Sequence, residues 1–207
     1  MRLLKKCKIE RALGTHLFLK GDRCASPKCG FTRRPTVPGI HGQAKKRRNV
    51  SEFGRQLKEK QKLRFTYIIP ERQLNKYFEE VKGGENAADM LLQILESRLD
   101  NVIYRLGFSP SRSGARQLVS HGGILVNKKR ISVPSYRVKI GDEVAILPVR
   151  KDDVLNEKIR ETLKKRDMPK WLTVNLEHGA ATVKAAPEID DYKASFNLPA
   201  IAEYYSK

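Results

Sequence analysis

The residues of this chain that could do chemistry are mainly arginines and lysines whose spacing places them together. Arg112 and Arg116 are four residues apart, so in a helix they share one face. A histidine and a basic turn continue this face, formed by His121, Lys128, Lys129 and Arg130. Guanidinium forks and ammonium groups can bind successive phosphates. We therefore expect a phosphate-binding surface here, and no catalytic site.

A second basic surface is expected in the first third of the chain. It begins with a run of four like charges, Lys45, Lys46, Arg47 and Arg48. Such a run repels itself in isolation and becomes ordered against phosphate. The same surface is expected to include three basic residues of the following helix, Arg55, Lys58 and Lys62.

The distribution of charge supports two separate surfaces. The 207 residues include 42 Lys and Arg against 23 Asp and Glu, a net charge of +19. Residues 1–50 carry +12 and residues 101–140 carry +8, whereas residues 51–100 balance to zero and residues 141–207 carry −1. This pattern is typical of two polyanion-binding surfaces on a neutral scaffold. With one Trp and few other aromatic residues, phosphate contact is expected to outweigh base stacking.

Three cysteines, Cys7, Cys24 and Cys29, lie in the basic N-terminal region. Their odd number argues against a secreted disulfide framework and suits a reducing compartment. Three thiols are one short of a closed zinc site, so zinc would need a fourth ligand such as Glu10, His16 or His41. Free or buried thiols are the alternative. We expect no required cofactor and keep zinc as a hypothesis.

The elements that must position the basic residues can be read from caps and periodicity. Residues 1–48 are rich in Gly and Pro without a sustained period, so we expect loops there. Ser51 is a predicted N-cap for a helix over 52–64. Pro70 opens a second helix, 71–82. A stripe of apolar residues predicts one continuous third helix that ends at Gly107, formed by Leu91, Leu95, Leu99, Val102 and Leu106.

The second half changes from helix to strand. A short helix follows Ser111 and ends at two glycines. The predicted strands are 124–126, 131–138 and 143–147, with a basic turn at 127–130, and a β-hairpin is predicted from 173–176 and 181–184. Helices are also expected at 156–166 and 199–205. The stretch 96–147 thus reads as helix, turn, helix and a compact antiparallel sheet.

Nothing in the sequence predicts a membrane association. It has no apolar run near 18 residues, no signal-peptide core and no lipidation motif. We expect a soluble cytoplasmic protein.

At these residues the chain resembles a known family. Its matching motifs are Ser-Arg-Leu-Asp-Asn-Val-Ile-Tyr-Arg-Leu-Gly (97–107), Ala-Arg-Gln-Leu-Val (115–119), Ile-Leu-Val-Asn (124–127) and Pro-Ser-Tyr (134–136). They resemble the alpha-L RNA-binding module. The flanking segments 17–29, 38–42, 57–64, 71–74 and 202–207 are similar to the bacterial ribosomal protein S-four family. The resemblance spans nearly the whole chain.

The resemblance implies an α+β fold with three parts. A basic irregular segment covers 1–48, a helical domain covers 49–90 together with 188–207, and an inserted alpha-L module covers 91–187. In the module, two helices would pack on a small antiparallel sheet. In the metal-binding branch of the family a fourth cysteine follows the first by three residues, and here that position is Glu10.

The functional implication is a structural constituent of the small ribosomal subunit, located in the ribosome. Such a protein binds 16S ribosomal RNA, nucleates 30S assembly at a multi-helix junction and contributes to decoding fidelity. Its expected protein neighbours are ribosomal proteins S-three and S-five. No membrane and no small-molecule substrate are expected.

The alternative is an RNA-modifying enzyme that carries the same module beside a catalytic domain. The remaining sequence contains no Gly-rich phosphate loop, no Gly-x-Ser-x-Gly and no HExxH motif. Asp100 could suggest a catalytic aspartate. Its place beside Arg98 and four residues before Tyr104 predicts instead an aspartate paired on a helix surface. We therefore expect no enzymatic activity.

Overall fold

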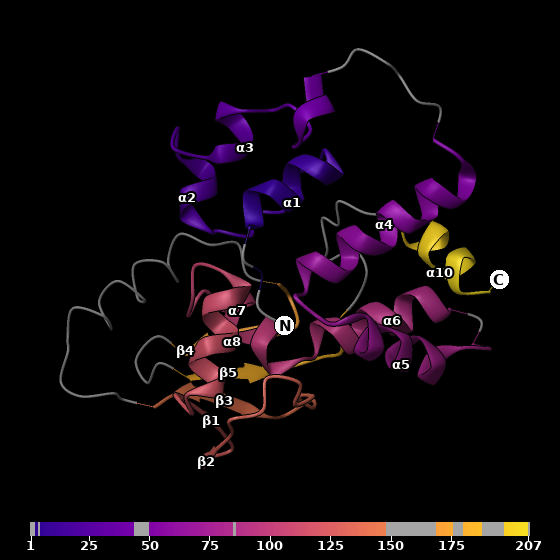
Figure 1. Cartoon of the computed structure of the whole chain (residues 1–207). Helices are drawn as coiled ribbons and strands as arrows, with labels where there is room; N and C mark the ends of the chain where they lie inside the picture. The colour runs from indigo at the N-terminus through magenta and orange to yellow at the C-terminus, as the bar shows by residue number, and fades with distance from the viewer. Residues whose placement is uncertain are drawn as a thin grey trace. The chain divides into compact units, whose positions relative to one another are not determined.

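The computed structural model describes residues 3, 5–43, 50–84, 86–147, 169–175, 180–187 and 197–206 (Figure 1). The chain divides into two compact units. The first unit contains residues 1–91 and 193–207, and the second contains residues 92–192. Each unit combines its elements around buried apolar side chains, and together they confirm the expected α+β class.

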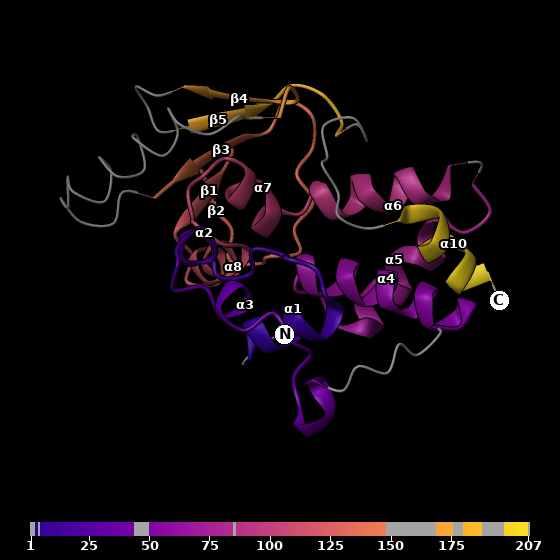
Figure 2. The same cartoon turned by 90° about the horizontal axis from the view of Figure 1, so that it is seen from above.

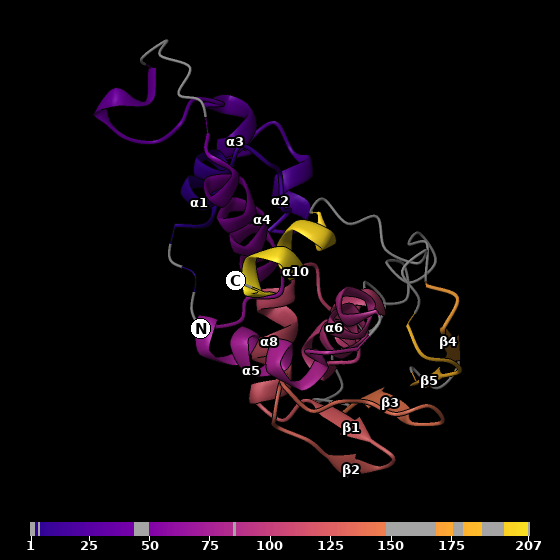
Figure 3. The same cartoon turned by 90° about the vertical axis from the view of Figure 1, so that its right-hand side faces the viewer.

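The N-terminal region is more helical than the sequence predicted. It contains the short helices α1 (Lys6–Leu13), α2 (Asp22–Ala25), α3 (Gly30–Arg33) and the 3-10 helix η1 (Ile40–Gln43), and α1, α2 and α3 lie together (Figure 3). Leu13, Leu17 and Leu19 form a small apolar cluster. Because these helices are short and separated by tight turns, no sustained periodicity marks them.

Helices α4 (Glu52–Thr66), α5 (Glu71–Val81) and α10 (Leu198–Ser206) complete the first unit. All three confirm predicted helices. The Ser51 hydroxyl accepts a hydrogen bond from the Gly54 N–H at 3.2 Å, as expected of an N-cap. The C-terminal helix α10 packs beside α4 although the two are far apart in sequence (Figure 1).

A buried lysine joins these helices. Lys60 of α4 is only 5% exposed, and its Nζ lies 2.6 Å from Oε1 of Glu71 and 4.3 Å from the centre of the Tyr204 ring. Tyr205 also donates a hydrogen bond to Glu71. Partial burial would raise the pKa of Glu71, but the bonds and charges of Lys60 and Arg64 lower it. The pair therefore fastens α10 to α4 and α5.

The predicted third helix is two helices, so the prediction of one continuous helix was wrong. Helix α6 (Ala87–Glu96) and helix α7 (Leu99–Arg105) are separated at Arg98, whose backbone is extended at φ −66° and ψ 136°. The Leu99 N–H donates to the Tyr136 carbonyl at 2.8 Å, and the Val138 N–H donates to the Ser97 carbonyl at 2.9 Å. These bonds to a distant segment replace the helical ones.

The second unit packs α7 and α8 (Arg112–Ser120) against an antiparallel sheet. Its strands are β1 (Ile124–Val126), β2 (Lys129–Arg130), β3 (Glu143–Ile146), β4 (Leu172–Asn175) and β5 (Ala180–Val183), in the order β2-β1-β3-β5-β4 (Figure 2). The register pairs Leu125 with Ala145 and Val144 with Ala181. The core between sheet and helices includes Leu99, Ile103, Val119, Ile124 and Trp171.

Two strand predictions need correction. Residues 131–138 are not a strand, because Pro134 lacks an N–H and a turn closes there with the Tyr136 N–H donating to the Val133 carbonyl. The basic turn is shorter than predicted, since Lys129 and Arg130 pair with β1 as strand β2. The predicted helix at 156–166 and the hairpin turn between β4 and β5 lie outside the described residues. None of the described helices has the length and apolar character needed to cross a membrane.

Candidate nucleic-acid interface

Helix α8 carries the two arginines that the sequence singled out, and both face α7. The Arg112 Nε donates to Oδ1 of Asn101 at 2.8 Å, and the Arg112 guanidinium lies 4.4 Å from the centre of the Tyr104 ring. One terminal nitrogen of Arg116 lies 3.4 Å from Oδ2 of Asp100. The shared helix face is thus confirmed. Because both guanidinium groups have fixed partners, their positions are set before any ligand arrives.

The partner of Arg112 is itself held by a buried carboxylate. The Glu96 side chain is fully buried and accepts from Asn101 Nδ2 at 2.6 Å and from Arg105 Nε and a terminal nitrogen at 2.9 and 2.7 Å. A continuous chain of hydrogen bonds therefore runs from Arg105 through Glu96 and Asn101 to Arg112. Such networks restrict side chains to one arrangement when every member is satisfied.

The partner of Arg116 is buried as well. Asp100 accepts two hydrogen bonds from Arg98, at 3.1 and 2.7 Å, and the Arg98 side chain is completely buried. The prediction that Asp100 is paired was correct, but its predicted place on the helix surface was wrong. It is buried because the chain turns at Arg98 and brings the pair under α8. With two guanidinium groups around it, this carboxylate is a structural anchor.

The remaining members of this face surround the C-terminal end of α8. Arg130 donates from Nε to the Gly122 carbonyl at 2.8 Å and from a terminal nitrogen to the His121 carbonyl at 3.0 Å. His121, Lys128 and Lys129 are exposed. We call this set the α8 face: Arg112, Arg116, His121, Lys128, Lys129 and Arg130. All six lie within the second unit, where Arg112 and Arg116 contact α7 and Arg130 contacts the end of α8.

The predicted basic residues of the first unit lie on α4. Two of them have acidic partners, since Arg55 pairs with Glu52 at 2.5 Å and Lys62 pairs with Glu59 at 2.6 Å. Lys58 is exposed and makes no ion pair with a described residue. The other four candidates, Lys45, Lys46, Arg47 and Arg48, lie outside the described residues.

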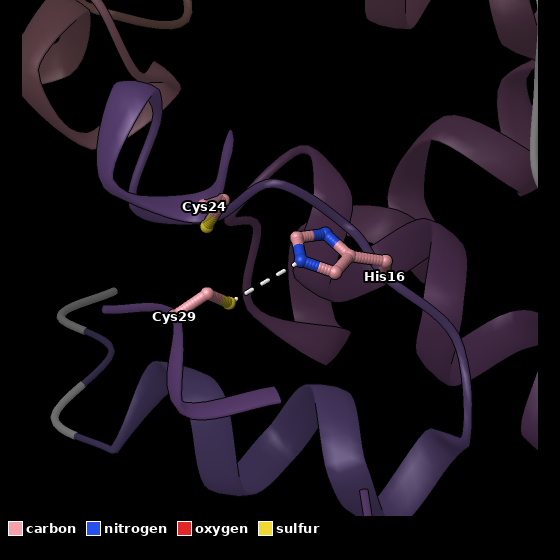
Figure 4. Close-up of side chains that lie close together, drawn as sticks. All are labelled: His16, Cys24 and Cys29. Carbon is pink, nitrogen blue, oxygen red and sulfur yellow. Dashed lines mark hydrogen bonds between the residues drawn. The ribbon is translucent and has the colours of Figure 1, made fainter. Parts of the chain in front are cut away.

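The predicted metal ligands are only partly grouped. The structure brings together His16, Cys24 and Cys29, whose ligand atoms all lie within 4.8 Å of one another (Figure 4). The Cys29 sulfur lies 3.4 Å from His16 Nε2. Cys7 is not in this group of three, although it lies close to Gly30 at the start of α3. Two sulfurs and one imidazole are the donor types that zinc prefers.

The environment of these ligands is preset by a buried glutamate. Glu10 is completely buried, and its Oε1 accepts from the N–H groups of Leu17 and Leu19, both at 3.1 Å, which fixes the loop that carries His16. Burial opposes ionisation of the Cys29 thiol, but hydrogen bonds from the Thr32 N–H and His16 lower its pKa to about 7. Burial raises the pKa of Cys24. Cys29 is therefore the thiol that ionises more easily.

Sequence reasoning missed the residues that hold the arginines in place. Asn101 follows Glu96 by five residues and Arg105 follows it by nine. The three side chains meet only because the helix breaks between α6 and α7. Neither of these distances from Glu96 is a spacing that brings side chains together on one helix. The absence of any acidic residue from 101 to 140 was the available signal, because it left Glu96 and Asp100 as the nearest carboxylates.

Comparison with known protein families divides the chain near the boundary between the two units. Residues 3–96 match the family described as Ribosomal protein S4/S9 N-terminal domain, and residues 97–144 match the S4 domain. Similar full-length proteins are called small ribosomal subunit protein uS4. The one from Gloeobacter violaceus is 45% identical over 202 residues, covering 97% of this chain and 96% of the relative. Those from Ruminiclostridium cellulolyticum and Thermus thermophilus are 46% and 44% identical, each with the same coverage. By both measures the chain belongs to the uS4 family of small ribosomal subunit proteins.

Proposed function

We propose that this protein is a structural constituent of the small ribosomal subunit that binds ribosomal RNA without catalysing a reaction. The observation that carries the proposal is in the α8 face, where Arg112 and Arg116 are held by buried acceptors and Arg130 is bonded to the end of α8. Membership of the uS4 family supports the same role. The proposed ligand is the phosphate backbone of folded RNA.

The geometry suits recognition of RNA shape. A-form helices hide their major groove, so a protein surface meets mainly phosphates and 2′-hydroxyl groups. Guanidinium groups that are already held in place lose little side-chain entropy when they bind phosphate. The α8 face and the basic N-terminal region would each contact one part of the RNA. Selectivity would then depend on whether one RNA can reach both surfaces.

At finer detail, we propose that the RNA is 16S ribosomal RNA at a junction of several helices. Binding there would nucleate assembly of the 30S subunit and contribute to decoding fidelity. Ribosomal proteins S-three and S-five are the proposed neighbours. These details rest on the family resemblance and on the two basic surfaces, which together suit a junction better than a single duplex.

The test is cosedimentation combined with charge reversal. Tagged protein should sediment with small ribosomal subunits, and Arg112→Glu and Arg116→Glu should each weaken binding to the junction RNA because a phosphate contact becomes a repulsion. Glu143→Gln, at the exposed first residue of the central strand β3, serves as the control. If both reversals leave affinity unchanged while circular dichroism shows a folded protein, the α8 face is not the RNA-binding surface.

We also propose that one zinc ion can be held by Cys24, Cys29 and His16, with Cys7 as the candidate fourth ligand. The support is the grouping of three zinc-type donors and the lowered pKa of Cys29. Elemental analysis should find about one equivalent of zinc, removable by a chelator. Cys29→Ser should abolish binding, and Cys7→Ser should weaken it. Protein that contains essentially no zinc after purification in zinc-supplemented buffer would end this proposal.

A further inference from the structure

A basic hollow lies in the N-terminal region of the first unit, and none of the predicted RNA-binding residues lines it. It has a volume of about 630 Å³ and is lined by Arg11, Arg33, Arg34 and the loop 35–40. This volume is within the range of about 300–1,000 Å³ that is typical of small-molecule sites. No acidic side chain is among the described residues that line it.

The three arginines of the hollow differ from those of the α8 face in their partners. Within the described part of the chain, none of them forms an ion pair with a carboxylate. Arg11 donates only to a backbone carbonyl, that of Arg34, at 3.4 Å, which ties α1 to the end of α3. Three positive charges therefore face the hollow without an internal counter-ion.

The other wall of the hollow is apolar and exposed. Ile40 is 96% exposed and Val37 is 54% exposed, and both lie in the loop that also contains Pro35 and Pro38. Side chains that are left so exposed gain nothing from the protein core. Together with the guanidinium planes they offer flat or apolar surface beside a cluster of phosphate-binding groups.

The loop is folded against itself in a way that only glycine permits. A Cβ atom on Gly42 would lie 1.8 Å from the Val37 carbonyl oxygen, and the Gly42 N–H donates to the Gly39 carbonyl at 3.1 Å. Because the Val37 carbonyl belongs to the backbone, it cannot move away as a flexible side chain could. The apolar wall is thus held in one shape before any ligand binds.

We propose that this hollow binds one unpaired nucleotide of the RNA, with the phosphate on the arginines and the base against Val37, Pro38 and Ile40. The proposal rests on the proposed RNA-binding function and names the kind of RNA element that this surface takes. Unstacked bases in loops and bulges are the parts of RNA that stack on arginine guanidinium planes as well as on aromatic rings.

Other anionic partners fit the hollow less well. An A-form duplex presents phosphates on a convex surface and keeps its bases stacked inside, so it cannot cover the apolar wall. An acidic peptide could pair with the guanidinium groups, but its carboxylates lack a flat face for Val37 and Ile40. A protruding nucleotide can place its phosphate on the arginines and its base against the apolar residues at the same time.

The direct test is nuclear magnetic resonance of the full chain with adenosine monophosphate as the probe. Millimolar adenosine monophosphate should shift the side-chain signals of Arg33 and Arg34 and the methyl signals of Ile40. Inorganic phosphate should shift only the arginine signals, because it has no base. Unchanged signals from residues 33–40 would overturn the proposal. So would an oligoglutamate peptide that shifts these signals when the nucleotide does not.

A second measurement uses RNA and keeps the protein's charge constant. A single strand should bind about tenfold more tightly than a duplex with the same number of phosphates. The double variant Arg33→Lys with Arg34→Lys should reduce this ratio toward one, because lysine lacks the planar fork. Ile40→Ser should reduce it several-fold. Arg72→Lys, on the exposed side of α5, is the matched control and should leave the ratio unchanged.

Different results would contradict the nucleotide site and the RNA-binding function. If the protein binds junction RNA but the ratio is the same in every variant, the hollow is not a nucleotide site and the RNA-binding function stands. If the wild-type protein binds neither RNA, the proposed function itself is wrong.

Discussion

The α8 face and the N-terminal hollow are both basic, but their arginines are held by different means. Arg112 is fixed by Asn101, which bonds to the buried Glu96. Arg116 is fixed by Asp100, which bonds to the buried Arg98. The arginines of the hollow have no described carboxylate partner, and backbone contacts at Gly42 and Arg34 shape their surroundings. The α8 face therefore holds its arginines in fixed positions, whereas the hollow presents positive charge that no described carboxylate neutralises.

This difference has a thermodynamic consequence. An arginine that already faces a carboxylate contributes less net positive charge to a bound RNA, so it should release fewer counter-ions from the phosphates. In return, its side chain is already ordered. We therefore expect the hollow to account for more of the salt dependence of RNA binding, and the α8 face for more of its dependence on geometry.

The largest effect is expected from breaking the anchor of the α8 face. Asp100→Asn removes the carboxylate that pairs with the fully buried Arg98 at 2.7 Å, which should cost about 3–5 kcal/mol of unfolding free energy. Chemical denaturation measures this loss. Glu143→Gln, an acid-to-amide change at an exposed site of the same unit, should cost about 0.5 kcal/mol or less. An equal loss in both variants would show that Asp100 is not an anchor.

The salt dependence of RNA binding compares the two regions directly. Replacing Arg11, Arg33 and Arg34 by Gln should together reduce the slope of log affinity against log salt by about 0.7–0.9, the contribution of the one phosphate that they are proposed to bind. Replacing Arg116 by Gln should reduce the slope by less, because the Asp100 carboxylate already neutralises part of its charge. Titrations between about 50 and 200 mM salt give both slopes. An equal or larger change for Arg116 would mean that Asp100 does not screen it.

A third variant tests whether a partly buried ion pair also stabilises the first unit. Glu71 accepts from the buried Lys60, and its side chain is one-third exposed, so Glu71→Gln should cost only about 1–2 kcal/mol. Because the pKa of Glu71 is lowered below 4.5, its contribution is present above that pH and is lost as the pH falls through the lower value.

Denaturation of the wild type and of Glu71→Gln at several pH values tests this sign. The difference between them should shrink on acidification below about pH 4.5. Glu79→Gln, whose ion pair with Lys82 is exposed, is the control and should show little difference at any pH. A difference that grows toward acid pH would contradict the assignment.

The smallest effect is expected at a glycine of the α8 face. Gly122 has φ +71°, and an added Cβ would lie 2.2 Å from Arg130 Nε. The left-handed backbone should cost Gly122→Ala about 1 kcal/mol, while the flexible Arg130 moves aside. Gly83→Ala, also left-handed but with open space around it, isolates the backbone cost. Thermal unfolding compares them, and only Gly122→Ala should also weaken RNA binding.

Local signals in the sequence were sufficient for helices α4, α5, α8 and α10 and for the class of ligand. Ser51 and Ser111 cap the helices predicted from them, and Pro70 precedes the helix expected there. These features depend on residues within one turn, so neighbouring sequence contains the information. The same holds for the net charge and for the shared face of Arg112 and Arg116, which follows from helical spacing alone.

Tertiary structure decided where the chain departs from its local pattern. The apolar stripe from Leu91 to Leu106 is continuous in sequence, yet the helix breaks at Arg98. It breaks because the backbone groups of Ser97 and Leu99 form hydrogen bonds with residues 138 and 136. That break buries Arg98 with Asp100 and brings Glu96 to Asn101. The group of His16 with Cys24 and Cys29, and the hollow between Arg11 and Arg34, likewise join residues with no regular spacing. Contacts between distant segments have no periodicity in the sequence, so only the folded chain reveals which charges are paired and which are free to bind RNA.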